Sequence, residues 1–124
     1  MNQVIKWIVV AVLMLHGLIH VMGFLKEWHL ADIKTLTDRT LVPLSDAMSR
    51  VLGLAWLGAC VLLIYAAAAL LARFEKWWIP ALLGIGLSQA LVILWWNDAR
   101  AGTVVNIILL GVILLRLTSG RPLP

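Results

Sequence analysis

The chain has 124 residues, of which 63% are hydrophobic and 13% are charged. Soluble domains contain about 45–50% apolar and about 25% charged residues, so this composition excludes an ordinary soluble domain and indicates a membrane protein. The net charge is +4, but the basic residues lie near the ends of apolar runs instead of forming one patch. That distribution is typical of contact with lipid headgroups and argues against nucleic-acid binding.

Four long apolar runs predict an all-α fold, an antiparallel four-helix transmembrane bundle that forms one integral membrane domain over residues 1–124. About 20 residues at about 1.5 Å rise cross a hydrocarbon core that is about 30 Å thick. The first three runs meet this length, whereas the fourth is short and needs little tilt or a thinned bilayer. The expected spans cover residues 4–25, 51–72, 77–96 and 103–117.

His16 and His20 are four residues apart in the first run, so both rings point the same way from one helix. An ionisable residue within a span is costly and is a functional hypothesis by default. The spacing suits two ligands of one metal ion, but the spans hold no carboxylate to complete the site. A haem with two histidine ligands would need a homodimer to supply the second face. A ligand, haem or quinone site, a proton relay and plain hydrogen bonding between helices all stay open.

The loop of residues 26–50 is the only sizeable connection, and its apolar and charged residues alternate at roughly helical spacing. This pattern predicts a short amphipathic helix that lies in the membrane interface. Pro43 would end that helix, and Ser45 with Asp46 would cap the second span. The segment would serve either as a connector over the mouth of the bundle or as a lid over a binding site.

Four spans place both termini on one side, which the compact turn Arg73–Lys76 and the basic tail predict to be the cytoplasm. Lys and Arg residues number five on each side, so the positive-inside rule gives a tie. Most of the tryptophans lie near span ends, which predicts interfacial belts. These residues are Trp28, Trp77, Trp78, Trp95 and Trp96.

Ser88 and Gln89 fall near the middle of the third run. An unpaired amide in hydrocarbon costs several kcal/mol, so we expect Gln89 to find a hydrogen-bond partner. His16 or His20 would be that partner if the first and third spans adjoin. Ser88 and Gln89 would then either hold the helices together through hydrogen bonds or line a small polar cavity.

A polar cluster marks the turn between the third and fourth runs. Asp98 and Arg100 are close enough in sequence to pair, and Gly102 completes the turn. Thr103 is expected to cap the fourth helix, and Asn106 lies one turn inside it. We predict that these residues fix the turn and supply buried hydrogen bonds.

Enzymatic motifs are absent from the sequence. Cys60 is the only cysteine, which excludes intramolecular disulfides and cysteine metal clusters. The sequence contains no nucleotide-binding loop, catalytic triad, paired carboxylates or HExxH motif. A non-enzymatic role is therefore favoured.

Two stretches resemble small bacterial four-helix membrane proteins of the DoxX-like kind. Residues 16–24 read HGLIHVMGF, and Ser88-Gln89 is followed by residues 96–106, WNDARAGTVVN, which match the pattern D-A-[KR]-x-G-T-x-x-N. The resemblance implies a four-helix fold and a place in the bacterial cytoplasmic membrane. Most such proteins have no assigned activity, although some are linked to sulfur-compound oxidation with quinone as acceptor, or to redox-stress complexes. No residue here matches a catalytic motif that would carry over.

The favoured function is therefore an accessory or binding subunit of the inner membrane, with a polar interior built by His16, His20, Gln89 and Asn106. A redox subunit that binds haem or quinone through the span-one histidines is the first alternative. The second is a small transporter or channel, as a dimer, because four short helices enclose little pore. Membrane lipid and a second copy or another membrane protein are the expected partners.

Overall fold

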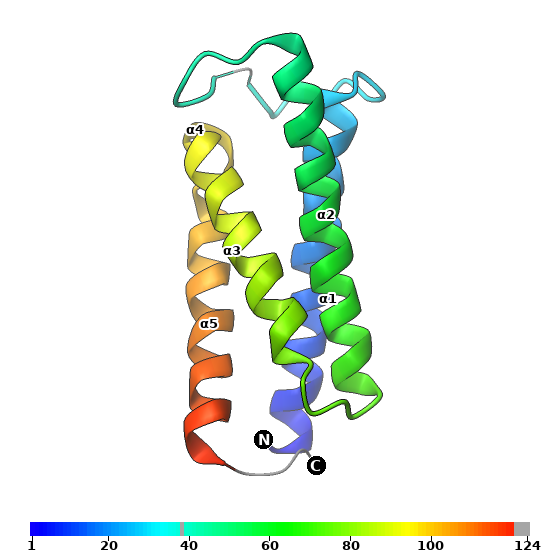
Figure 1. Cartoon of the computed structure of the whole chain (residues 1–124), viewed down its shortest axis with the longest axis vertical. Helices are drawn as coiled ribbons and strands as arrows, with labels where there is room; N and C mark the ends of the chain where they lie inside the picture. Colours follow the sequence, from blue (N-terminus) through cyan, green and yellow to red (C-terminus); the bar gives the residue numbers. More distant parts are fainter. Residues whose placement is uncertain (38, 121–124) are drawn as a thin grey trace.

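The computed structural model describes residues 1–37 and 39–120, and these residues form helices and no strands (Figure 1). The helices are α1 (Gln3–Glu27), α2 (Asp46–Leu71), α3 (Trp78–Leu94), α4 (Trp96–Ala99) and α5 (Ala101–Ser119). In Figure 1, α1 and α2 run side by side, while α3 crosses from the lower end of α2 to the upper end of α5. The N-terminus and the end of α5 lie at the same end of the bundle.

Side-chain caps define where the first two helices begin. The Asn2 side chain accepts a hydrogen bond from the backbone N–H of Ile5, at 2.8 Å. The Ser45 hydroxyl accepts from the backbone N–H of Met48, at 3.2 Å, which confirms the predicted cap of α2. Asp46 lies in the first turn of that helix, where a negative charge is favourable.

The described residues form five helices and not the four expected, because Trp95 interrupts the third. Trp95 leaves the helical region, with φ −104° and ψ 42°. Its indole ring packs against that of Trp56, with the ring centroids 5.7 Å apart. One short turn, α4, then leads into α5. The polar turn between the third and fourth predicted spans is therefore itself helical.

Helix lengths differ from those predicted. Three helices, α1, α2 and α5, are long and apolar enough to cross a membrane. The run predicted to be short gives the 19-residue α5, which begins at Ala101, before Thr103, and continues to Ser119. The third run, predicted to be long enough, gives α3 with only 17 residues. The break at Trp95 accounts for both differences in length, because it ends α3 early and α5 then begins earlier than predicted.

The prediction of an amphipathic helix between the first two spans is wrong. Residues 28–37 and 39–45 form no helix, and Asp38, part of the predicted pattern, lies outside the described residues. The loop instead bonds to other parts of the fold. The Lys26 ammonium donates to two loop carbonyls, at 2.6 and 2.7 Å, and the Leu41 N–H donates to the Leu94 carbonyl, at 2.7 Å. These bonds replace those that a local helix would make.

Two apolar clusters form the core, and a polar layer separates them. The larger cluster, in the lower part of the bundle, includes Leu13, Leu63, Trp77, Leu109 and Ile113. The smaller, upper cluster contains Trp56, Ala59, Leu91 and Trp95. Trp77 and Trp95 are only 1% and 5% exposed, so the prediction that they belong to interfacial belts is wrong. Their rings fill the interior where helices diverge.

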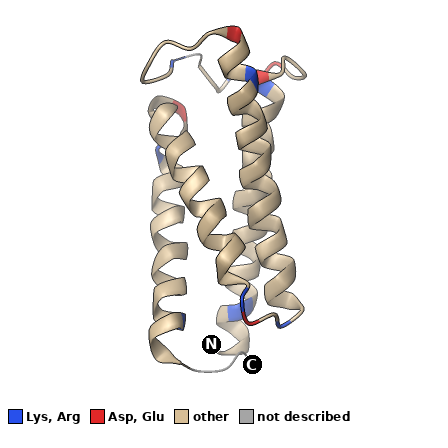
Figure 2. Ribbon diagram, in the orientation of Figure 1, with Lys and Arg blue, Asp and Glu red and all other residues tan. Residues whose placement is uncertain are grey.

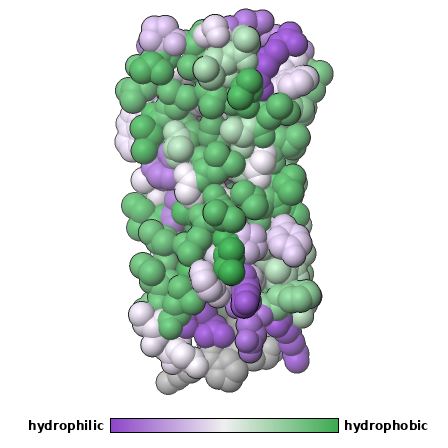
Figure 3. Space-filling view, in the orientation of Figure 1, coloured by the Kyte–Doolittle hydropathy of each residue, from purple (hydrophilic) through white to green (hydrophobic). Residues whose placement is uncertain are grey.

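The outer surface is largely apolar. Figure 3 shows a mainly hydrophobic face along the middle of the molecule, with hydrophilic residues gathered mostly toward its two ends. The basic and acidic residues, coloured on the ribbon in Figure 2, follow the same distribution. Helix α5 is the most exposed long helix, with Asn106, Leu109 and Ile113 as its only buried residues. A soluble protein would have to cover such a surface.

Candidate functional site: a polar layer beside a cavity

Three helices supply the polar layer between the apolar clusters. His16 and His20 come from α1, Ser88 from α3 and Asn106 from α5, and each is at most 5% exposed. The half-buried Gln89 joins them from α3. The structure thus brings together all five residues predicted to form a polar interior. That they bind a ligand stays a prediction.

Asn106 is the centre of the hydrogen-bond network. Its Oδ1 accepts from His16 Nε2, at 2.8 Å, and its Nδ2 donates to Ser88 Oγ and to Gln89 Oε1, both at 3.0 Å. An amide nitrogen only donates and an amide oxygen only accepts. These partners therefore fix the orientation of the Asn106 amide and require a proton on His16 Nε2.

His20 has the opposite arrangement of protons. Its Nδ1 donates to the backbone carbonyl of His16, at 2.7 Å, because a carbonyl only accepts. In the neutral imidazole its Nε2 is then an acceptor, and the Ser88 hydroxyl donates to it, at 2.8 Å. Both nitrogens of His20 are used. Among the described residues no side chain or backbone group bonds the remaining nitrogen of His16, Nδ1.

Gln89 finds its partners in α5 and not in α1. Its Oε1 accepts from Asn106, and its Nε2 donates to the hydroxyl of Thr103, at 3.1 Å. The expectation that His16 or His20 pairs with Gln89 is wrong, because the two histidines bond Asn106 and Ser88. Thr103 does not cap α5, which begins two residues earlier, so its hydroxyl is available to Gln89.

Asp98 joins the loop to the helices instead of pairing with its neighbour. Its carboxylate accepts from the Thr37 N–H, at 2.8 Å, and from the Thr37 hydroxyl, at 2.9 Å. No ion pair forms between Asp98 and Arg100, both of which the structure describes. Gly102 lies beside His16, where a Cβ would come 3.6 Å from the imidazole Cε1. The predicted Asp98–Arg100 pair is therefore wrong, although the turn is firmly held.

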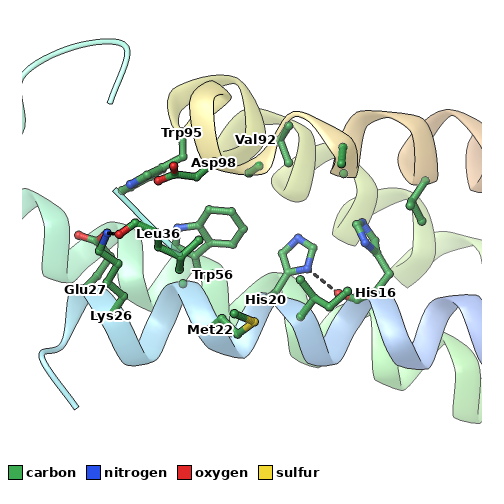
Figure 4. Close-up of a pocket in the computed structure, with 16 residues that line it drawn as sticks. His16, His20, Met22, Lys26, Glu27, Leu36, Trp56, Val92, Trp95 and Asp98 are labelled. Atoms are coloured by element: carbon green, nitrogen blue, oxygen red, sulfur yellow. Dashed lines mark hydrogen bonds between the residues drawn. The ribbon is translucent and has the colours of Figure 1, made fainter. Parts of the chain in front are cut away.

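A cavity of about 310 Å³ adjoins the polar layer. Figure 4 shows its walls, with His16 and His20 rising from α1 toward the ribbon of α3, α4 and α5. The dashed line in that view marks the bond from His20 to the His16 carbonyl. Its apolar lining includes Ile19, Met22, Leu36, Trp56, Val92, Trp95 and Val105.

The cavity has two polar ends. His16 and His20 form the inner end, while Lys26, Glu27 and Asp98 lie at the outer end, under the loop. Leu36 of that loop forms part of the wall, so the loop covers the cavity. This position agrees with both predicted roles of the segment, connector and lid.

Two features of the wall bear on what the cavity can hold. The indole Nε1 of Trp56 is buried and has no hydrogen-bond partner. Ile19 and Met22 line the cavity but are 60% and 38% exposed, so the cavity reaches the outer surface along α1. His16 Nδ1 is thus the unpaired polar atom beside the cavity, and an occupant would enter past apolar side chains.

A metal or haem centre does not fit these residues. Among the described residues, no group of three or more His, Cys, Asp or Glu side chains could hold a metal ion. Three of the four ring nitrogens of His16 and His20 already bond protein groups. Only His16 Nδ1 is available, and one nitrogen makes neither a two-histidine metal site nor a two-histidine haem site.

Sequence reasoning missed two residues of the cavity wall. Trp56 lies five residues after the start of its apolar run of residues 51–72, close enough to the span end to suit an interfacial belt. No signal in the sequence therefore indicated that Trp56 would line a cavity. Leu36 gave no signal either, since its place depends on the path of the loop.

No protein-family model, no curated protein and no solved structure matches this chain. The resemblance to DoxX-like proteins therefore stays a prediction from the two sequence stretches. The interpretation of the site rests on the residues and their contacts alone.

Proposed function

We propose that this chain is a small multi-pass protein of the bacterial cytoplasmic membrane, in which α1, α2, α3 and α5 cross the bilayer. Three of these helices have the length and composition that a span needs. The 17 residues of α3 meet the lower limit of about 17 residues for a transmembrane helix, and a locally thinned bilayer accommodates it. The apolar outer surface of the bundle supports the same placement.

Within the membrane the protein acts as a non-enzymatic binding subunit for an uncharged, mainly apolar small molecule. The cavity carries this proposal, because about 310 Å³ falls within the range of about 300–1,000 Å³ that is typical of ligand sites. Its lining has the usual composition of such sites, apolar walls with a few polar groups. A charged occupant would lose its hydration among these side chains without gaining an ion pair at the inner end.

The unpaired groups define the polar part of the occupant. His16 Nδ1 accepts a hydrogen from a hydroxyl, and Trp56 Nε1, buried without a partner, would donate to a carbonyl or hydroxyl oxygen once the indole ring turns toward the occupant. A ring that carries oxygen atoms meets both needs. This observation favours quinone-type molecules as a second candidate, in which the protein is a redox subunit.

Native mass spectrometry of the protein, released from its own membrane in mild detergent, tests the proposal. We expect one small molecule bound per chain. Ala101→Phe fills the cavity, because Ala101 lines it, and should lose the adduct. Val104→Phe adds the same bulk at a position of α5 that is 60% exposed and outside the cavity, and should retain it. Equal occupancy in both variants, or no adduct in the unmodified protein, would overturn the proposal.

A further inference from the structure

The end of the bundle opposite the cavity contains a buried cation. Lys6 lies in the second turn of α1 and is only 5% exposed. Among the described residues no acidic side chain pairs with it, and its ammonium makes no hydrogen bond there. The side chain of Lys6 is thus largely buried, and an ionisable residue within an apolar helix is a functional hypothesis by default.

Two further donors at this end have no partner. The indole Nε1 of Trp77 and the guanidinium Nε of Arg116 are both buried without a hydrogen bond. Trp77 is 1% exposed, so water outside the bundle does not reach it. Polar groups that are buried in native proteins are usually bonded, so these two buried donors, at the same end as a lysine ammonium without a partner among the described residues, need an explanation.

Helical geometry places these groups at the same end of the bundle. Trp77 belongs to the lower apolar cluster, together with Val10 of α1 and Ile113 of α5. Lys6 lies one turn below Val10 on the buried face of α1, and the partly buried Arg116 lies one turn below Ile113. Figure 2 shows basic residues near the lower ends of both α1 and α5.

The described acidic residues do not balance this charge. Glu75 is the one acidic residue described at this end of the bundle, and it is exposed in the turn between α2 and α3. It forms no ion pair with Lys6 or Arg116. The three donors are therefore suited to an anion that comes from outside the described chain.

We propose that Lys6, Trp77 and Arg116 bind a phosphoryl anion. An ammonium, a guanidinium and an indole N–H all donate to phosphate oxygens, and the charge-assisted bonds are the strong ones. This step rests on the membrane placement proposed above, which puts this end of the bundle at the level of the lipid headgroups, where basic residues between transmembrane helices bind them. The same chemistry would accept the headgroup phosphate of an anionic lipid or a free phosphate. This inference does not depend on what the cavity holds.

Native mass spectrometry in a detergent micelle separates these sources. The purified protein is titrated with dioctanoyl phosphatidylglycerol, with dioctanoyl phosphatidylcholine and with inorganic phosphate. We expect one tight site for the anionic lipid, weakened about tenfold or more in Lys6→Gln and in Arg116→Gln. Trp77→Phe keeps the ring and removes the N–H, and should weaken the site less. Tight binding of inorganic phosphate, with the same sensitivity to the variants, would identify a free-anion site.

Lys76→Gln is the matched control, because Lys76 lies at the same end but is exposed. It removes the same charge and should leave the affinity unchanged. Thermal unfolding of each variant checks the fold, and removing an unpaired buried charge should not lower its midpoint. The proposal is overturned if Lys6→Gln and Arg116→Gln bind the lipid as the unmodified protein does, or if Lys76→Gln weakens binding equally.

Discussion

Asn106 Oδ1 accepts the proton of His16 Nε2 at 2.8 Å, so an amide in α5 fixes the tautomer of an imidazole in α1. Helices α1 and α5 otherwise touch little compared with the close packing of α1 against α2. The contact therefore has two effects. It joins α5 to α1, two helices that otherwise make few contacts. It also leaves His16 Nδ1 without a protein partner beside the cavity.

Asn106→Leu should destabilise the bundle by about 1–3 kcal/mol. The substitution keeps a similar volume but removes the bonds to His16, Ser88 and Gln89, and buried groups that lose their partners bear the cost of desolvation. Unfolding in mixed micelles with increasing denaturing detergent measures the change. Leu110→Ala shortens a partly exposed side chain of α5 and is expected to cost less. If the two variants unfold alike, the network contributes little.

Gly23→Ala should also destabilise the fold, through packing. A Cβ at Gly23 would lie 2.5 Å from the indole of Trp56, so α1 and α2 must separate or the ring must move. Overpacking of this kind costs about 1–3 kcal/mol. The tryptophan fluorescence spectrum should shift as well, because Trp56 changes its surroundings.

Gly111→Ala provides the matched control for Gly23. A Cβ at this position meets nothing within 4 Å, and alanine favours a helix over glycine by about 0.5–1 kcal/mol. The same substitution should therefore stabilise the protein at Gly111 and destabilise it at Gly23. Two changes of the same sign would contradict the close contact between Gly23 and Trp56.

Asp98→Ala should release the loop that covers the cavity. Asp98 bonds the N–H and hydroxyl of Thr37, and hydrogen bonds to charged groups contribute about 1.5–3 kcal/mol. Amide hydrogen exchange at Thr37 should become about tenfold faster or more. Asp46→Ala removes a carboxylate on the same side of the bundle that makes only exposed contacts with His29 and Arg50, and should leave that exchange unchanged. If the Thr37 amide exchanges as slowly in Asp98→Ala as in the unmodified protein, the bonds from Asp98 do not hold the loop in place.

Cysteine accessibility tests whether the helices cross a membrane. In a Cys60→Ser background, Ala31→Cys marks the loop between α1 and α2, and Glu75→Cys marks the turn between α2 and α3. A membrane-impermeant maleimide applied to intact cells should label only one of them, and Glu75→Cys should react only after lysis. Labelling of both from outside would contradict a transmembrane α2. The reverse pattern would keep the spans but invert the orientation.

The sequence predicted the helical class and the cap at the start of α2, because apolar runs and capping residues are local signals. Ser45 is an example, since its cap depends only on neighbouring residues. The break at Trp95 was missed because no local signal marks it, and the ring of Trp95 packs against Trp56, which is far away in the sequence. The prediction of a helix between the first two spans failed for a similar reason. The described residues of this loop bond to α1 and to the end of α3, which are not its sequence neighbours.

The polar residues were found because an unpaired group is costly in an apolar run, whatever the arrangement of helices. Their partners were not found. Gln89 was expected to bond a histidine. Its hydrogen-bond partner depends on which helices adjoin and on which residues lie at the same level along the bundle, and the composition of the runs determines neither. Thr103 is an example. It was expected to cap the fourth helix, but α5 begins at Ala101, so the Thr103 hydroxyl instead accepts a hydrogen bond from Gln89.

Nitrogen NMR of the labelled imidazoles tests the central claim most directly, that His16 presents an unpaired acceptor to an occupant of the cavity. The spectrum distinguishes protonated from unprotonated ring nitrogens. We predict a proton on Nε2 of His16 and on Nδ1 of His20. Comparison of the protein as purified with its Ala101→Phe variant should move the signal of His16 Nδ1 and leave both His20 signals in place. Identical tautomers in the two histidines, or a His16 Nδ1 signal that does not respond to filling the cavity, would contradict the account.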